Sequence, residues 1–244
     1  MKKLTHILSL GLSILMLTAL SGCGEEEGTT PFSANRTITA ADAESIALTV
    51  LEFNDFAASF RQVNNGTKDS VKIGNSTYKV VDSASYDCAV SGTVTFTIDS
   101  DAGTFTITSN NCNDGIEVVN GYLTLAGSTS GTVSTISFSF NITIDGITNS
   151  GSINSTFDSA DNSYTFSINM NLTTPEGGLI ITTNQPFTGI GLNYASSGQM
   201  TITGANNTSL RITALDTDVQ IEVDEDGDGV YETNYTTPWA NLGN

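Results

Sequence analysis

The chain has 244 residues, of which 26 are acidic and eight are basic, and its formal net charge is −18. After Lys79 the only basic residue is Arg211, so no cationic surface can neutralise phosphates, and the sequence excludes nucleic acid as a partner. The single histidine is His6. If the N-terminal residues are removed, the chain has no histidine general base and no histidine-containing zinc site.

Residues 1–22 have the organisation of a secretory signal, with Lys2 and Lys3 followed by an apolar run over residues 7–20. The run of 14 residues is shorter than the roughly 20 that a membrane-spanning helix needs. The segment closes with Leu-Ser-Gly-Cys, which is similar to the bacterial lipoprotein signal and implies that Cys23 carries acyl chains such as palmitate. Gly24 follows where an aspartate would imply retention at the inner membrane. We therefore expect a lipoprotein anchored in the outer membrane through Cys23, with the membrane as its partner.

Residues 23–37 are polar, acidic and aperiodic, which predicts a flexible tether. The next segment has Thr39 as a candidate N-cap and an apolar stripe at the spacing of a helix: Ile46, Val50, Phe53, Ala57 and Phe60. We predict a helix over about residues 40–61, at the start of a single β-rich domain that covers residues 38–244.

Alternation of apolar and polar residues characterises the chain after Val71 and is clearest over residues 137–144 and 164–172. Similar segments lie at 71–81, 90–98, 103–109, 116–126, 147–157, 179–183, 199–203, 209–214, 218–223 and 230–235. Short connections with turn signals separate them, which favours an antiparallel meander. We predict a mainly β fold, in which a large curved sheet or open barrel packs on the N-terminal helix. A β-sandwich is the alternative.

Cys88 and Cys112 are an even pair of cysteines in a chain expected to be exported, which predicts a disulfide. The segments on either side of residues 99–102 are typical of a hairpin. Pairing Val94 with Ile107 would bring the cysteines within one residue of opposite each other, and a bulge would complete the approach. A catalytic or metal-binding thiol pair is the competing interpretation.

An acidic segment near the C-terminus places Asp224, Asp226 and Asp228 at alternate positions, with glycines between and after them. Oxygen ligands in this pattern suit calcium, and the segment resembles the start of EF-hand-like and dockerin-type loops. It departs from them at the twelfth place, where Tyr235 stands instead of a bidentate glutamate, and Glu232 is the candidate substitute. We predict a structural calcium site made by these three aspartates and Glu232. An acidic hairpin turn is the alternative.

Residues 38–44, the strand from Cys112 to Gly121 and the ending 198–242 with Trp239 look like a group of uncharacterised bacterial lipoproteins. This resemblance implies location and architecture and transfers no activity. The absence of histidine after the leader and the Ser/Thr/Asn-rich strand faces favour a non-catalytic, lipid-anchored envelope protein that acts as a binding or structural module. The alternative is a carrier of lipid or another apolar ligand, held in a half-barrel cavity beside the helix.

Overall fold

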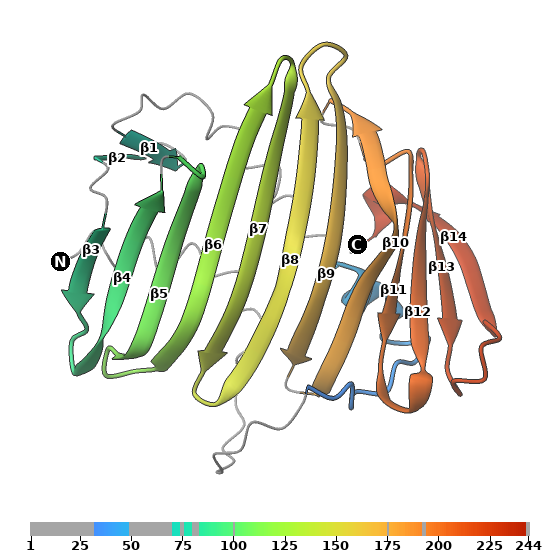
Figure 1. Cartoon of the computed structure of the whole chain (residues 1–244). Coiled ribbons are helices and arrows are strands. Elements are labelled where there is room, and N and C mark those ends of the chain that lie inside the picture. Colours follow the sequence, from blue (N-terminus) through green and yellow to red (C-terminus); the bar gives the residue numbers. More distant parts are fainter. Residues whose placement is uncertain are drawn as a thin grey trace.

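The structure is a computed structural model that describes residues 32–48, 70–73, 76–79, 83–99, 101–174, 176–191 and 194–242. Figure 1 shows that its main feature is one broad sheet. Twelve strands, β3 to β14, lie side by side in sequence order, and β1 and β2 form a separate two-stranded sheet. All neighbouring strands are antiparallel. The predicted antiparallel meander is confirmed, the sheet is open, and the described strands do not form the alternative β-sandwich.

The strands lengthen toward the centre of the sheet and shorten toward both edges. Their bounds are β1 (Ser70–Ile73), β2 (Ser76–Lys79), β3 (Ser83–Asp87), β4 (Ser91–Asp99), β5 (Thr104–Asn113), β6 (Val118–Ser130), β7 (Val133–Ile144), β8 (Ile147–Asp158), β9 (Ser163–Thr174), β10 (Gly177–Ile190), β11 (Ser197–Thr203), β12 (Ser209–Leu215), β13 (Asp218–Asp224) and β14 (Thr233–Pro238). Two short 3-10 helices, η2 (Ala205–Asn207) and η3 (Trp239–Asn241), complete the described elements that follow β1.

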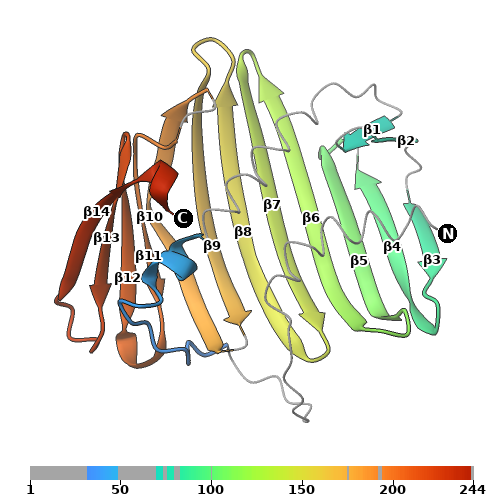
Figure 2. The same ribbon diagram turned by 180° about the vertical axis from the view of Figure 1, so that it is seen from behind.

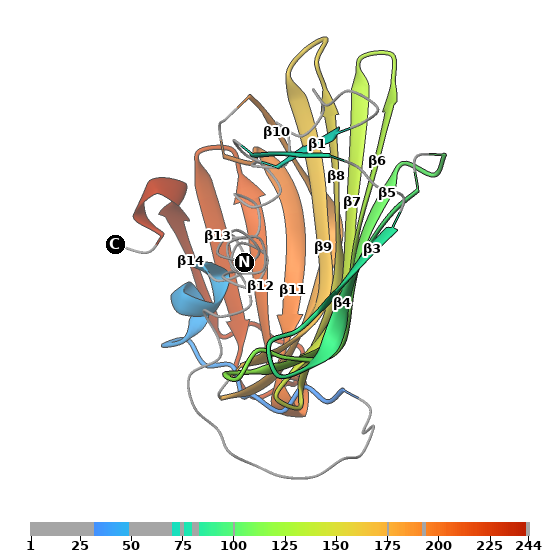
Figure 3. The same ribbon diagram turned by 90° about the vertical axis from the view of Figure 1, so that its left-hand side faces the viewer.

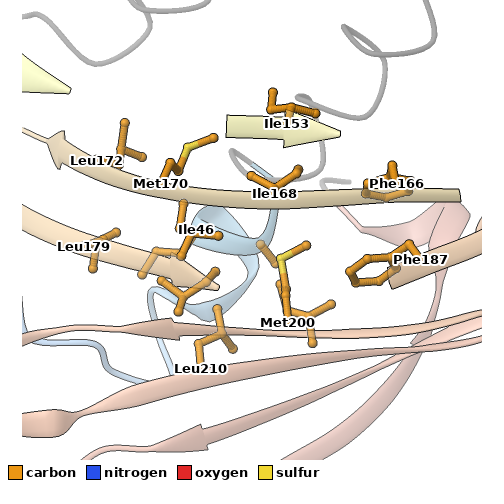
Figure 4. Close-up of a cluster of buried hydrophobic side chains, with 14 of the residues drawn as sticks. Ile46, Ile153, Phe166, Ile168, Met170, Leu172, Leu179, Phe187, Met200 and Leu210 are labelled. Atoms are coloured by element: carbon orange, nitrogen blue, oxygen red, sulfur yellow. The ribbon is translucent and has the colours of Figure 1, made fainter. Parts of the chain in front are cut away.

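The core lies on one face of the sheet and extends from β6 to β13, with most of its fully buried side chains in β9 to β13. In β9 every second residue from Tyr164 to Leu172 is buried, because successive side chains of a strand point to opposite faces. Phe166 stacks on Phe187 of β10 with ring centroids 5.0 Å apart, and Met200 of β11 is fully buried beside them (Figure 4). The alternation in the sequence therefore becomes a one-sided apolar core.

Residues 43–48 are helical and lie on the face around which the C-terminal half of the sheet curls (Figures 2 and 3). Ala43, Ile46 and Ala47 are buried in the same apolar cluster as the sheet residues. Just before this helical segment, the Thr39 hydroxyl donates a hydrogen bond to the Asp42 carboxylate at 2.8 Å. Residues 49–61 of the predicted helix lie outside the described residues, so its full length and packing stay predictions.

Four points of the strand prediction need correction. The segment predicted as one strand at 71–81 forms two paired strands, β1 and β2. Phe96 pairs with Ile107 and Val94 with Ser109, so the predicted register is wrong by two positions. The reason is the turn: the Asp99 carboxylate accepts the N–H groups of Asp101 and Ala102, and the strands resume at Thr104. Strand β3 was missed because it is short and mostly exposed, and because only Ala84 and Tyr86 carry its alternation, which is too weak a signal over five residues. The predicted strand 230–235 is wrong in its bounds, since β14 begins at Thr233.

Candidate metal site and polar face

Four carboxylates converge in the loop between β13 and β14. Asp224, Asp226, Asp228 and Glu232 each offer one oxygen, and these atoms all lie within 4.8 Å of one another. Asp224 is only 2% exposed, whereas the other three are exposed. The loop thus brings together the whole predicted ligand set in an arrangement that could hold a metal ion.

Backbone N–H groups hold the buried carboxylate in place. The two oxygens of Asp224 accept hydrogen bonds from Gly227 at 2.7 Å and Gly229 at 3.0 Å. Both glycines have positive φ, +78° and +89°, which favours glycine. A Cβ at Gly227 would also collide with the carbonyl oxygen of Asn206. The glycines of the sequence pattern therefore let the chain fold tightly around Asp224.

The exposed aspartates shape the rest of the loop. Asp226 accepts the N–H of Asp228 at 3.1 Å, and Asp228 accepts the N–H of Val230 at 2.7 Å. Glu232 returns to accept the N–H of Glu225 at 3.1 Å. These bonds keep residues 225–232 out of the strand ladder, which explains the late start of β14. They also leave four like charges close together, and a cation would relieve their repulsion.

A partly buried ion pair that the sequence did not predict lies next to this loop. Arg211 of β12 binds Glu222 of β13 through two hydrogen bonds of 2.6 Å each, and its guanidinium lies 4.0 Å from the ring centroid of Tyr231. The hydrogen bonds that Arg211 donates to Glu222 raise the pKa of Arg211. Glu222 is only 7% exposed, so its charge depends on this partner. The only sequence signal for this ion pair was the isolated position of Arg211 in an acidic chain.

The acidic loop also contacts the segment through which the chain enters the domain. Glu225 accepts the N–H of Ala40 at 3.0 Å. Nearby, Ala205 of η2 donates its N–H to the carbonyl of Arg36 at 2.7 Å, and the N–H of Ile38 donates to the hydroxyl of Thr208 at 3.1 Å. The loop and the entry segment are therefore parts of one end of the molecule.

Cys88 and Cys112 are joined as a disulfide, with their Cα atoms 5.4 Å apart. Cys112 lies in β5 and Cys88 lies in the connection between β3 and β4, so the bridge ties this connection to β5. The expected bulge is present as a register shift between Ser91 and Thr93, with Asn111 opposite at φ +47°. The structure therefore supports the disulfide over the alternative of a free, reactive thiol pair.

The face of the sheet opposite the core carries continuous rows of small polar side chains. One row crosses all twelve strands in register: Ser83, Thr97, Thr106, Thr124, Ser139, Ser152, Asn169, Thr182, Thr201, Arg211, Glu222 and Asn234. At the usual strand spacing it is about 50 Å long. All members before Arg211 are uncharged and at least partly exposed. We call the surface around this row the polar face.

Hydrogen bonds between neighbouring strands order these side chains. Thr106 and Thr124 lie 3.1 Å apart through their hydroxyls, and in a parallel row the Ser137 hydroxyl donates to Asn154 at 2.6 Å. Such pairs stabilise the sheet and fix the orientation of the groups that a partner would meet. The polar face is thus a preorganised hydrogen-bonding surface.

Comparison with known proteins adds no relative: the chain matches no protein-family model, no curated protein and no solved structure. The resemblance to a lipoprotein group therefore stays a prediction. Cys23 and the tether up to residue 31 lie outside the described residues. Within the part that the structure describes, no helix is both long enough and apolar enough to cross a bilayer.

Proposed function

We propose that this protein is a lipid-anchored, non-catalytic envelope protein that uses its polar face as a binding or structural surface. The observation that carries the proposal is the uncharged row from Ser83 to Thr201, in a chain whose net charge is −18. Acidic groups elsewhere repel polyanions, whereas this face offers hydroxyl and amide groups in a regular array. An uncharged, hydrogen-bonding polymer such as a neutral polysaccharide fits that chemistry.

The test of this surface is binding to a panel of insoluble neutral polysaccharides, measured by co-sedimentation. A Thr124→Glu, Ser139→Glu variant places two carboxylates in adjacent strands of the polar face. A Ser159→Glu, Ala160→Glu variant places the same charges in an exposed turn and serves as the control. We expect loss of binding only in the first variant. Equal binding by wild type and both variants would show that the polar face is not the binding surface.

The lipid anchor is supported by the sequence Leu20-Ser21-Gly22-Cys23. We propose outer-membrane location, and we expect the N-terminal peptide of the protein from its own envelope to begin at an acylated Cys23. Mass spectrometry of that peptide is the test, and a Cys23→Ser variant should leave the membrane fraction. An N-terminal peptide without acyl chains would remove the anchor from the proposal.

The absence of catalysis is supported by the missing histidines after residue 6 and by the loop acids, whose oxygens accept backbone N–H groups. The measurement is turnover on a broad panel of glycan, ester and peptide substrates. Hydrolysis that disappears when one carboxylate is changed to its amide would overturn this part of the proposal.

Calcium is the ion that we propose for the acidic loop, in a structural role. Oxygen donors within 4.8 Å of one another, one of them nearly fully buried, suit a hard cation of variable coordination. The bound ion would stabilise the β13–β14 hairpin and the entry segment that Glu225 holds.

A carrier of lipid or another apolar ligand is the second candidate. It is favoured by Phe96, Phe105 and Leu123, which lie on the core-side face of β4 to β6 and are only partly buried. Against it, the core over β9 to β13 is filled by fully buried side chains. Native mass spectrometry of protein purified from its own envelope decides between them, because a carrier should retain a co-purified lipid.

A further inference from the structure

Four exposed aliphatic side chains belong to the connections and strand starts at one end of the sheet. Val90 is 65% exposed, Ile116 85%, Val118 38% and Ile147 39%. They lie in the β3–β4 connection, the β5–β6 connection, the start of β6 and the start of β8. In Figure 1 these connections are at the lower end of the green and yellow-green strands. We call these four residues the aliphatic tip.

Backbone contacts show that the tip residues belong to adjoining loops. The N–H of Val90 donates to the carbonyl of Asn113 at 2.9 Å, and Asn113 pairs with Val118. Val118 in turn donates its N–H to the Asp145 carboxylate at 2.8 Å, in the turn that leads into Ile147. The register places Ile147 on the face of Ile144 and Val118 on the opposite face, so the tip residues flank the end of the sheet on both sides. Exposed apolar surface concentrated in this way at one end of a protein marks an interaction site.

The N-terminal segment enters the domain at this same end. Asn35 and Arg36 both donate their N–H groups to the carbonyl of Gly178, in β10 immediately after the β9–β10 turn. That turn and the β7–β8 turn lie at one end of the antiparallel sheet, because Ser150 pairs with Asn171. Figure 1 shows the entry segment in blue beside the lower ends of the strands.

The length of the tether decides which end of the sheet faces the membrane. From Cys23 to Phe32 the chain has nine peptide links and spans at most about 32 Å when fully extended. Strands β7 and β8 have 12 residues each and are about 40 Å long. A lipidated Cys23 therefore holds the entry end toward the bilayer, and it cannot reach around the sheet to turn the opposite end inward.

We propose that the aliphatic tip inserts into the interface of the leaflet that carries the lipidated Cys23 and acts as a second membrane contact. The proposal rests on the proposed lipid anchor. Asp114, Glu117 and Asp145 surround the tip, so anionic headgroups are repelled and a zwitterionic surface such as phosphatidylethanolamine is the partner that fits. The tether alone sets which end of the sheet is near the bilayer, and the second contact would also fix the angle at which the sheet stands on it.

The test places a fluorescent probe at each end of the full, lipidated protein in zwitterionic vesicles that contain spin-labelled lipid as quencher. Ile116→Trp reports on the tip, and Ile190→Trp is the matched control, because Ile190 is 61% exposed at the opposite end of β10. The native Trp239 is buried and contributes the same background to both. We expect lipid quenching of Ile116→Trp to exceed that of Ile190→Trp at least about twofold.

Equal quenching of the two probes would overturn the tip proposal. An emission shift of Ile116→Trp that appears only in native membranes, without lipid quenching, would also overturn it, because that result indicates a protein partner. The N-terminal mass tests the anchor separately. An acylated protein with an unquenched probe leaves the anchor standing and removes the tip. An unacylated chain whose Ile116→Trp is quenched on added vesicles keeps the tip and removes the anchor.

Discussion

Calcium should stabilise the folded protein, and the structure sets the size of the effect. Four side-chain oxygens converge, fewer than the six to eight ligands of a complete calcium shell, and three of the four acids are exposed. These features argue for the weak end of extracellular sites, with dissociation constants of roughly 0.1 to 1 mM. At about 5 mM calcium, binding to the folded state alone adds roughly 1 to 2 kcal/mol to the free energy of unfolding.

For a domain of this size, that gain corresponds to a rise in Tm of about 2 to 8 °C. The assay is thermal unfolding followed by circular dichroism, with calcium or with chelator. An Asp226→Asn, Asp228→Asn variant should lose the difference. An Asp99→Asn, Asp101→Asn variant, with the same change of charge in another exposed turn, should keep it. Identical melting curves for the wild type under both conditions would return the loop to a plain acidic turn.

Three further outcomes follow from the same structure. Alkylation of the unreduced protein should label neither Cys88 nor Cys112. Reduction should lower the free energy of unfolding by about 3 kcal/mol, because the bridge closes a long loop, and urea unfolding measures this loss. Arg211→Ala should cost about 2 to 3 kcal/mol by leaving the buried carboxylate of Glu222 unpaired, while Arg211→Lys should recover only part of it, in the same assay. Partial burial and the nearby acids raise the pKa of Glu117, so the stability that its protonated form contributes is present below the usual carboxyl pKa and is lost as pH rises. Glu117→Gln should therefore raise Tm at pH 7 but not at about pH 4. A Tm change of the same size at both pH values would contradict the assignment.

The candidate metal site was predictable to an unusual degree because it is local. Asp224, Asp226, Asp228 and Glu232 lie within nine consecutive residues, and the glycine positions indicate where the backbone turns back. The supporting pair of Arg211 and Glu222 was not predictable, because its partners come from two strands whose register the sequence does not specify. The disulfide lay between these cases: only two cysteines follow Cys23, but the exact strand pairing around them was wrong.

The sequence by itself determined the alternation that separates core from polar face, the order of the strands as a meander, and the residues of the acidic loop. Each of these depends on neighbours along the chain, where side-chain direction and turn chemistry act over a few residues. The tertiary structure decided the register of twelve strands, and with it the polar row from Ser83 to Asn234 and the aliphatic tip around Ile116. Those features join residues from up to twelve strands, and their alignment depends on turn lengths and bulges, which hydrophobic periodicity does not encode.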